Sequence, residues 1–165
     1  MIGARNPRRG TWTNAALAAV SVIVVFISGQ LATFPNLEPW YAGLAKPSFN
    51  PPNWLFGPVW TTLFVLMGFA LWRVLKMRAQ PALRRRAIVL FYLQLLLNAL
   101  WSWLFFAAHS PLLGLIDIVP QLAAIVAAVI VFRQLDVLAA LCMVPLALWV
   151  GFATILNAAI WRLNG

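Results

Sequence analysis

Residues 54–76 read WLFGPVWTTLFVLMGFALWRVLK, and this stretch decides the class of fold. Nineteen of its residues precede the first charged side chain, that of Arg73. A helix needs about 20 apolar residues to cross the hydrocarbon core of a bilayer. Because every backbone donor must be paired inside the hydrocarbon, a single strand is excluded there. The stretch is therefore predicted to be a transmembrane helix.

The rest of the chain has the same character. Of its 165 residues, 64% are hydrophobic and 9% are charged, whereas soluble domains are about half apolar and a quarter charged. A chain this short has too little interior to bury so much apolar surface, so lipid must cover it. We predict one domain over residues 1–165, an all-α membrane protein folded as a five-transmembrane-helix bundle. The predicted spans are about 14–34, 54–76, 87–107, 112–132 and 137–161.

The first span allows a second interpretation. Arg8 and Arg9 precede an apolar run, as they would in a cleavable or twin-arginine signal peptide. No tidy A-x-A cleavage site follows the run, so we favour a membrane span.

The positive charges are distributed unevenly along the chain, which carries +9 in total. If the amino terminus and the second and fourth connections share one side of the membrane, that side holds ten cations. The other side then holds two, Lys46 and Arg162. The positive-inside rule places the amino terminus in the cytoplasm, with the carboxyl terminus and loop 35–53 outside. The basic excess is thus a signal of topology and lipid headgroups, and we expect no nucleic-acid partner.

Residue types that usually carry chemistry are scarce. Cys142 and His109 are the only residues of their types, which leaves no disulfide framework and does not support a zinc or di-metal cluster. The sequence also lacks a nucleophile–base pair and a phosphate-binding loop. We therefore expect no bound metal and no required cofactor. No residue can be assigned a catalytic role with certainty from the sequence.

Two of the nine tryptophans lie deep within predicted spans. Trp60 follows Trp54 by six residues, or about 9 Å along a helix, and Trp149 is twelve residues from either end of 137–161. A deep indole needs a partner for its N–H, so both are predicted to face the bundle interior. Trp101 and Trp103 are ambiguous. The tryptophans at segment ends, interpreted as an interfacial belt, are Trp12, Trp54, Trp72 and Trp161.

Aromatic and polar side chains repeat along one face of three spans, because residues three or four apart share a helix face. These repeats predict an aromatic-walled, sparsely polar pocket that suits a flat hydrophobic ligand better than an ion. The residues are Trp60 and Phe64, then Gln94, Asn98 and Trp101, and finally Trp149, Ala153 and Asn157.

Asp117 is the only acid deep in a span, and Gln121 follows it by one turn. A buried carboxylate is costly unless it is protonated or paired. We favour a structural hydrogen bond to a neighbouring helix over a proton-linked site. Asp117, Gln121 and Gln94 are possible polar support for the pocket.

Loop 35–53, PNLEPWYAGLAKPSFNPPN, contains five prolines. Proline fixes φ and restricts its predecessor, so the loop is predicted to be a shaped lid that loses little entropy when ordered. It carries Trp40 and Tyr41, which are interpreted either as an interfacial anchor or as part of the pocket.

Three runs resemble the TspO/translocator protein family, also called tryptophan-rich sensory proteins or peripheral-type benzodiazepine receptors. They are WYAGLAKPSFNPPNWLFGPVW (40–60), LQLLLNALWSWLFF (93–106) and VPLALWVGFATILNAAIWRLN (144–164). The runs occur in the family's order, and the resemblance covers nearly the whole chain.

The resemblance implies a five-helix bundle, commonly a homodimer, that binds porphyrins such as protoporphyrin and haem beneath the first loop. It also implies a bacterial cell envelope or a mitochondrial outer membrane, of which we expect the former. Carried over by motif, the ligand-binding residues are Trp40, Tyr41, Trp60, Phe64, Asn98, Trp101, Trp149, Ala153 and Asn157.

Two positions depart from the family's pattern in the last span. Leu146 follows Pro145 where a tyrosine is usual, and Ala158 follows Asn157 where animal members commonly have a tyrosine. The cholesterol motif proposed for the family needs a central tyrosine before its basic residue. Sterol binding through that motif is therefore not expected here.

The resemblance leaves three functions open. The protein is expected to bind a tetrapyrrole and to sense or regulate its level. The alternatives are a porphyrin transporter and a light-dependent porphyrin-degrading enzyme, whose radical carriers would be Trp40, Tyr41 and Trp149. A rocking transporter is disfavoured because five spans offer no even inverted repeat.

Overall fold

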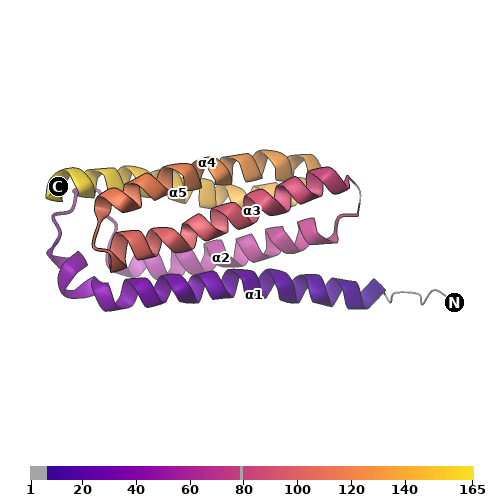
Figure 1. The fold of residues 1–165 in the computed structure, drawn as a ribbon, viewed down its shortest axis with the longest axis horizontal. Coiled ribbons are helices and arrows are strands. Elements are labelled where there is room, and N and C mark those ends of the chain that lie inside the picture. The colour runs from indigo at the N-terminus through magenta and orange to yellow at the C-terminus, as the bar shows by residue number, and fades with distance from the viewer. Residues whose placement is uncertain (1–6, 79) are drawn as a thin grey trace.

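The computed structural model describes residues 7–78 and 80–165, which form five long helices and no strand (Figure 1). All five are long and apolar enough to cross a membrane, so the predicted all-α five-helix membrane bundle is confirmed. The helices are α1 (Pro7–Thr33), α2 (Asn53–Lys76), α3 (Pro81–Ser102), α4 (Pro111–Leu135) and α5 (Val137–Asn164).

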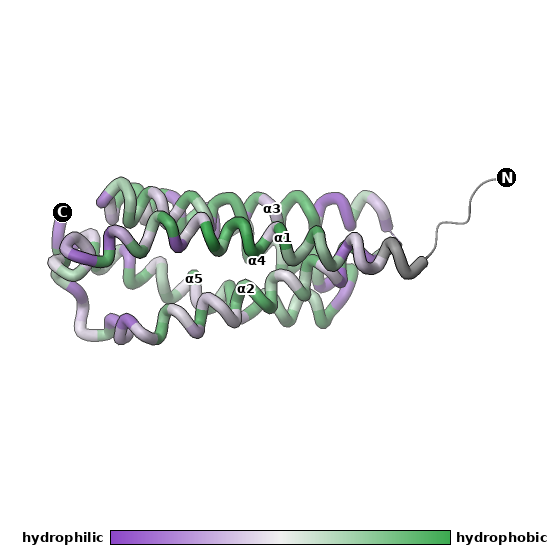
Figure 2. Tube along the Cα trace, turned by 90° about the horizontal axis from the view of Figure 1, so that it is seen from below, coloured by the Kyte–Doolittle hydropathy of each residue, from purple (hydrophilic) through white to green (hydrophobic). Residues whose placement is uncertain are grey.

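The helices form a closed ring. α1 packs against α2 and α3, α5 packs against α2 and α4, and α4 completes the ring against α3. Figure 2 shows hydrophobic residues along the central lengths of the helices and more hydrophilic ones toward the bundle ends. This pattern is the one that a lipid solvent requires, because polar groups can reach water only at the ends.

Three short helical turns extend the long helices. Phe34–Asn36 (η1) and Leu37–Tyr41 (η2) continue from α1, and Trp103–Ala107 (η3) continues from α3. The predicted lid 35–53 is therefore irregular only in its later part. The amine of Lys46 donates to three backbone carbonyls of the lid, among them that of Tyr41 at 2.6 Å.

The side chain of Asn164 fastens the lid to the end of α5. Its Oδ1 accepts from the backbone N–H of Ala45 at 2.9 Å, and its Nδ2 donates to the carbonyl of Ala45 at 2.9 Å. The lid accordingly runs beside the carboxyl end of the chain (Figure 1). We call this end of the bundle the lid end and the opposite end the basic end.

The half of the bundle toward the basic end is filled by apolar side chains. Met67, Leu71, Phe91, Phe132 and Met143 are all fully buried there. The rings of Phe91 and Phe132 are stacked with their centroids 6.2 Å apart. Such a core excludes water and stabilises the ring of helices by dispersion contacts.

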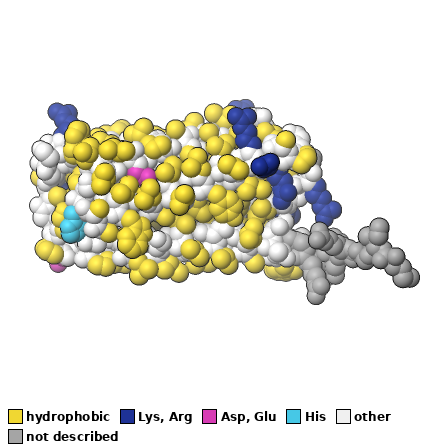
Figure 3. Space-filling model, in the orientation of Figure 1, with side chains coloured by type: hydrophobic (Ala, Val, Ile, Leu, Met, Phe, Trp, Pro, Cys, Tyr) yellow, Lys and Arg dark blue, Asp and Glu magenta, His cyan; other side chains and the backbone are white. Residues whose placement is uncertain are grey.

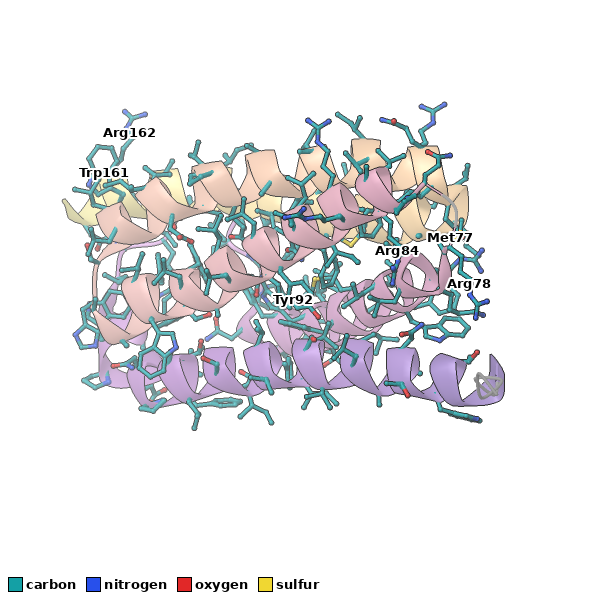
Figure 4. The ribbon with its side chains drawn as sticks, turned by 45° about the vertical axis from the view of Figure 1, so that its right-hand side comes forward. Met77, Arg78, Arg84, Tyr92, Trp161 and Arg162 are labelled. Carbon is teal, nitrogen blue, oxygen red and sulfur yellow. The ribbon has the colours of Figure 1, made fainter. Side chains whose placement is uncertain are left out.

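The charges separate along the bundle axis as the sequence predicted. In Figure 4, Arg78 and Arg84 lie at the end opposite Trp161 and Arg162, and Figure 3 shows the basic side chains gathered toward the first of these ends. The two described termini also lie at opposite ends (Figure 1). Arg5, one of the ten cations, lies outside the described residues. That the basic end faces the cytoplasm stays a prediction.

Asp136 joins α2 to the α4–α5 connection at the basic end. Its Oδ2 accepts from Arg73 Nη2 at 2.7 Å and from Nε at 2.9 Å, and its Oδ1 accepts from the backbone N–H of Ala139 at the start of α5. The hydrogen bond from Arg73 holds the pKa of Asp136 below its ordinary value, and the Ala139 N–H adds to this effect.

We predict that this contact stabilises the fold at neutral pH and fails in acid. Because the folded-state pKa is the lower one, the stabilisation is complete above the unfolded pKa of about 3.9 and is lost as the pH falls through the folded value. Asp136→Asn keeps an oxygen for the Ala139 N–H but removes the charge, so it should cost about 1 kcal/mol or less at pH 7. Asp136→Ala should cost about 1 kcal/mol more, because the helix cap is lost too.

Unfolding by sodium dodecyl sulfate in mixed micelles, followed by circular dichroism between about pH 2 and pH 7, measures both effects. The loss of stability in acid should be smaller in Asp136→Asn than in the unmodified protein. Equal losses would contradict the role given to the ion pair.

Candidate functional site

The half of the bundle toward the lid end encloses a cavity of about 330 Å³. All five helices and the lid contribute to its wall. Ligand pockets of this kind are mostly apolar, with a few placed polar groups. The cavity lies beneath the first loop, which contributes Leu37 and Tyr41 to its wall.

Three tryptophans from three helices face the cavity. Trp60 of α2 lies against Phe64 with ring centroids 5.9 Å apart, and Trp101 of α3 is stacked on Phe105 at 5.0 Å. Trp149 of α5 completes the set. Of these three tryptophans only Trp101 donates its indole N–H to a described residue, the Oδ1 of Asn157.

Most of the residues singled out in the sequence meet at this cavity. Because they come from separate spans, only the folded ring brings them together. Those in its wall are Tyr41, Trp60, Phe64, Asn98, Trp101, Gln121, Trp149, Ala153 and Asn157. Trp54, interpreted as an interfacial residue, also lines it.

Asn157 ties three helices together at the cavity wall. Its Oδ1 accepts from the indole N–H of Trp101 at 3.0 Å, and its Nδ2 donates to the carbonyl of Pro111, the first residue of α4, at 2.7 Å. We call this pair of bonds the Asn157 clamp. It fixes the Trp101 ring in the wall, so Asn157 acts on that ring as well as lining the cavity.

Gly114 provides the space for the clamp. A Cβ at this position would lie 2.9 Å from Asn157 Oδ1 and 3.0 Å from the Phe105 ring. Only glycine leaves room for both side chains, so the helix α4 can approach α5 and η3 closely here.

Besides Asn157, two buried amides give the cavity a sparse polar character. Asn98 is 7% exposed, and its Nδ2 has no acceptor among the described residues. Gln121, on the neighbouring helix α4, is 2% exposed and also lines the wall. Since buried polar groups are normally hydrogen-bonded, Asn98 is the protein's clearest unused donor at the site.

Trp40 lies outside the cavity wall. Its ring is stacked on that of His109 at 4.7 Å and meets the edge of Phe105 at 5.6 Å. The imidazole Nε2 of His109 in turn lies 2.7 Å from Asn36 Oδ1. In this structure Trp40 therefore fastens the lid to the η3–α4 connection, and of the aromatic pair only Tyr41 reaches the cavity.

Gln94 and Asp117 are also absent from the wall. Gln94 is fully buried, with its Nε2 3.7 Å from Met67 Sδ. Asp117 is 5% exposed, and its Oδ2 has no hydrogen-bond partner among the described residues. The hydrogen bond to a neighbouring helix that we favoured for Asp117 is thus not formed with any described residue.

Sequence reasoning missed the contribution of α1. Phe26, Gly29, Gln30 and Thr33 line the cavity, and their spacing of three and four residues was a readable signal. α1 brings no tryptophan to the site, so residue type alone did not mark it. Trp103, left ambiguous in the sequence, donates to Ser28 Oγ at 3.0 Å outside the wall.

The described wall of the cavity contains no carboxylate, amine or imidazole. Nor do the described residues contain a group of three His, Cys, Asp or Glu side chains that could hold a metal ion. The chemistry that the wall itself offers is stacking, apolar contact and a few hydrogen bonds from amides and indoles.

We predict that breaking the clamp loosens the cavity. Asn157→Leu should cost about 1 kcal/mol of stability, the usual magnitude for an interhelical hydrogen bond in a membrane. Gly114→Ala should cost about 1–3 kcal/mol, because its methyl group would displace Asn157 and Phe105. Gly151→Ala is the matched control, since a Cβ there meets nothing within 4 Å. Unfolding in mixed micelles measures all three, and equal costs for the two glycine variants would contradict the packing argument.

The comparisons with known proteins agree with this architecture. Residues 16–162 match the TspO/MBR family. The chain is 42% identical to the tryptophan-rich protein TspO of Chlorobaculum tepidum over 149 residues, which cover 90% of this chain and 94% of that protein. It is 40% identical to the tryptophan-rich protein TspO of Archaeoglobus fulgidus, over 88% and 93% of the two chains.

An animal protein is similar as well. The chain is 38% identical to the human translocator protein over 128 residues, which cover 76% of this chain and 75% of that protein. Similarity of this extent, over most of the length of each partner, shows that the chain belongs to the TspO/MBR family of membrane proteins.

Proposed function

We propose that the protein binds a tetrapyrrole, protoporphyrin or haem, in the cavity beneath the lid and so senses or regulates its level. The observation that carries the proposal is the wall itself, in which Trp60, Trp101 and Trp149 approach one space from three helices. A flat conjugated ring offers each indole a stacking surface. The haem or protoporphyrin is a ligand here, and no cofactor is required.

The free donors support an orienting role for the polar groups. The Nδ2 of Asn98 has no acceptor among the described residues, and of the three wall tryptophans only Trp101 donates to one of them, through its bond to Asn157 Oδ1. A tetrapyrrole has ring nitrogens and carboxylate side arms that could accept hydrogen bonds from such donors. Each such bond is worth about 1 kcal/mol, which is enough to fix the ligand's orientation.

The packed half of the bundle favours a protein that holds its ligand in the cavity over one that transports it across the membrane. Beyond the cavity a ligand would meet Met67, Leu71 and Leu146, which are all fully buried. Transport across the membrane would require this core to open, at the cost of its dispersion and apolar contacts. We therefore keep the transporter as the alternative that a flux measurement in vesicles would support.

Two further properties extend the proposal. The basic end faces the cytoplasm by the positive-inside rule, so the lid and the cavity lie toward the outer face. The protein also forms a homodimer, as the family resemblance implies. Small residues at Ala15 and Ala19 of α1, and at Ala123 and Ala127 of α4, offer two close-packing faces for it.

We predict that wall residues determine the affinity for protoporphyrin. Trp149→Ala should weaken binding by about tenfold, because a stacking surface and its apolar contact are lost. Asn98→Leu should weaken it by about fivefold, the equivalent of about 1 kcal/mol for one hydrogen bond. Quenching of tryptophan fluorescence by added protoporphyrin, in detergent, gives the dissociation constants.

Trp161→Ala is the matched control for the loss of an indole. Trp161 is 38% exposed at the lid end and does not line the cavity, so its removal should leave the affinity unchanged. Unchanged affinity in both wall variants, with their helical content intact, would remove the ligand from this cavity.

A further inference from the structure

A further hollow lies on the lipid-facing side of the bundle, between α1 and α2. It has a volume of about 450 Å³ and is bounded by Ala15 and Ala19 on one side and by Gly68 and Trp72 on the other. We call it the α1–α2 groove. At its inner end are Phe26 and Phe64, whose rings meet edge to face at 5.2 Å.

The groove runs along the membrane normal for about one leaflet. The antiparallel register of α1 and α2 is fixed by the Asn14–Leu75 hydrogen bond and by the Phe26–Phe64 contact. The basic residue Lys76 follows Phe64 by twelve residues, which corresponds to a length of about 18 Å along the helix. Half of a hydrocarbon core about 30 Å thick is close to this length.

The walls of the groove are apolar and exposed. Val65 is 67% exposed and Ile23 is 51% exposed, and both line it. The small side chains of Ala15 and Ala19 leave the groove open on the α1 side, and on the α2 side Gly68 lets Val22 pack closely. In a bilayer, such a groove must be filled by a lipid chain or by a partner.

The mouth of the groove at the basic end carries an unneutralised cation. The ammonium of Lys76 lies over the ring of Trp72, 4.1 Å from its centroid, and Trp72 forms the end of the groove. The next cation along the chain is Arg78, which is exposed at the same end (Figure 4). The chain's three acids do not offset them, because Glu38 is at the lid end, Asp117 is buried and Asp136 is paired with Arg73.

We propose that the α1–α2 groove binds one anionic phospholipid of the leaflet at the basic end. One acyl chain lies in the groove and reaches the Phe26–Phe64 pair, and the phosphate lies at Lys76. The charge argues for lipid over a second copy of the chain. A twofold dimer through this face would bring Lys76 and Arg78 of both copies to the same membrane level, where like charges repel.

This lipid site does not depend on the tetrapyrrole proposal. The proposed lipid lies outside the cavity, and the cation that binds its phosphate is at the opposite end of the bundle from the cavity. The two share only the wall formed by Phe26 and Phe64. A bound chain would therefore support that wall from the lipid side.

Native mass spectrometry of the full chain released from nanodiscs tests the site. The discs contain equal amounts of phosphatidylglycerol and phosphatidylcholine with identical acyl chains. The unmodified protein should retain phosphatidylglycerol in excess. Lys76→Gln should lower the ratio of the two retained lipids by about fivefold, as expected for one cationic side chain near a membrane surface. Arg133→Gln, which removes a charge from the end of α4, should change the ratio little.

A bulky side chain placed in the groove tests whether a lipid acyl chain binds there. Ala19→Phe should reduce the retention of both lipids, whereas Val24→Phe, at an exposed position of α1 outside the groove, should not. Equal ratios in Lys76→Gln and Arg133→Gln, or undiminished retention in Ala19→Phe, would overturn the proposal. So would a wild-type dimer that Ala19→Phe converts to monomers, because a second copy would then occupy the groove.

Discussion

The arrangement of the lid half depends on one amide group, that of Asn157. Its oxygen and nitrogen bond to Trp101 and to the Pro111 carbonyl, so a single side chain of α5 holds the end of α3 and the start of α4. In the membrane there is little hydrophobic drive between helices, and packing and polar contacts must hold them. The Asn157 clamp supplies the polar contact, and Gly114 permits the packing around it.

The clamp matters because the lid half is hollow. Toward the basic end the helices are held by a continuous apolar core, whereas around the cavity many side chains lack neighbours on one side. Those side chains forgo dispersion contacts that a ligand can restore. The lid covers the hollow through bonds of its own, from Asn164 to Ala45 and from Lys46 to three carbonyls. The bundle thus has a closely packed half at the basic end and a hollow half at the lid end.

Much of the fold could be predicted from the sequence because lipid imposes simple constraints. Length and lack of charge define the five helices, and the placement of Lys and Arg predicts which connections share an end. The order of the helices around the ring could not be predicted, since apolar faces in lipid carry little information about their neighbours. Helical spacing placed Asn98 and Trp149 on faces that line the cavity, whereas Gln94, predicted on the same face as Asn98, lies outside the wall.

The remaining features depend on contacts between distant segments. Trp40 and Tyr41 are adjacent, yet one stacks on His109 and the other enters the cavity wall, because η2 turns them apart. The unpaired oxygen of Asp117 has no signature in the sequence, whereas the part of α1 in the wall is marked by helical spacing and not by residue type. For Trp40, Tyr41 and Asp117, tertiary packing and not local pattern decides the outcome.

We propose that the hollow half of the bundle holds a flat aromatic ligand. An experimental structure of the protein saturated with protoporphyrin would test this. We expect the macrocycle beneath the lid, between the rings of Trp60, Trp101 and Trp149, with the core around Met67 and Leu71 still closed. A macrocycle bound on the lipid-facing surface, or an empty cavity in the saturated protein, would contradict it.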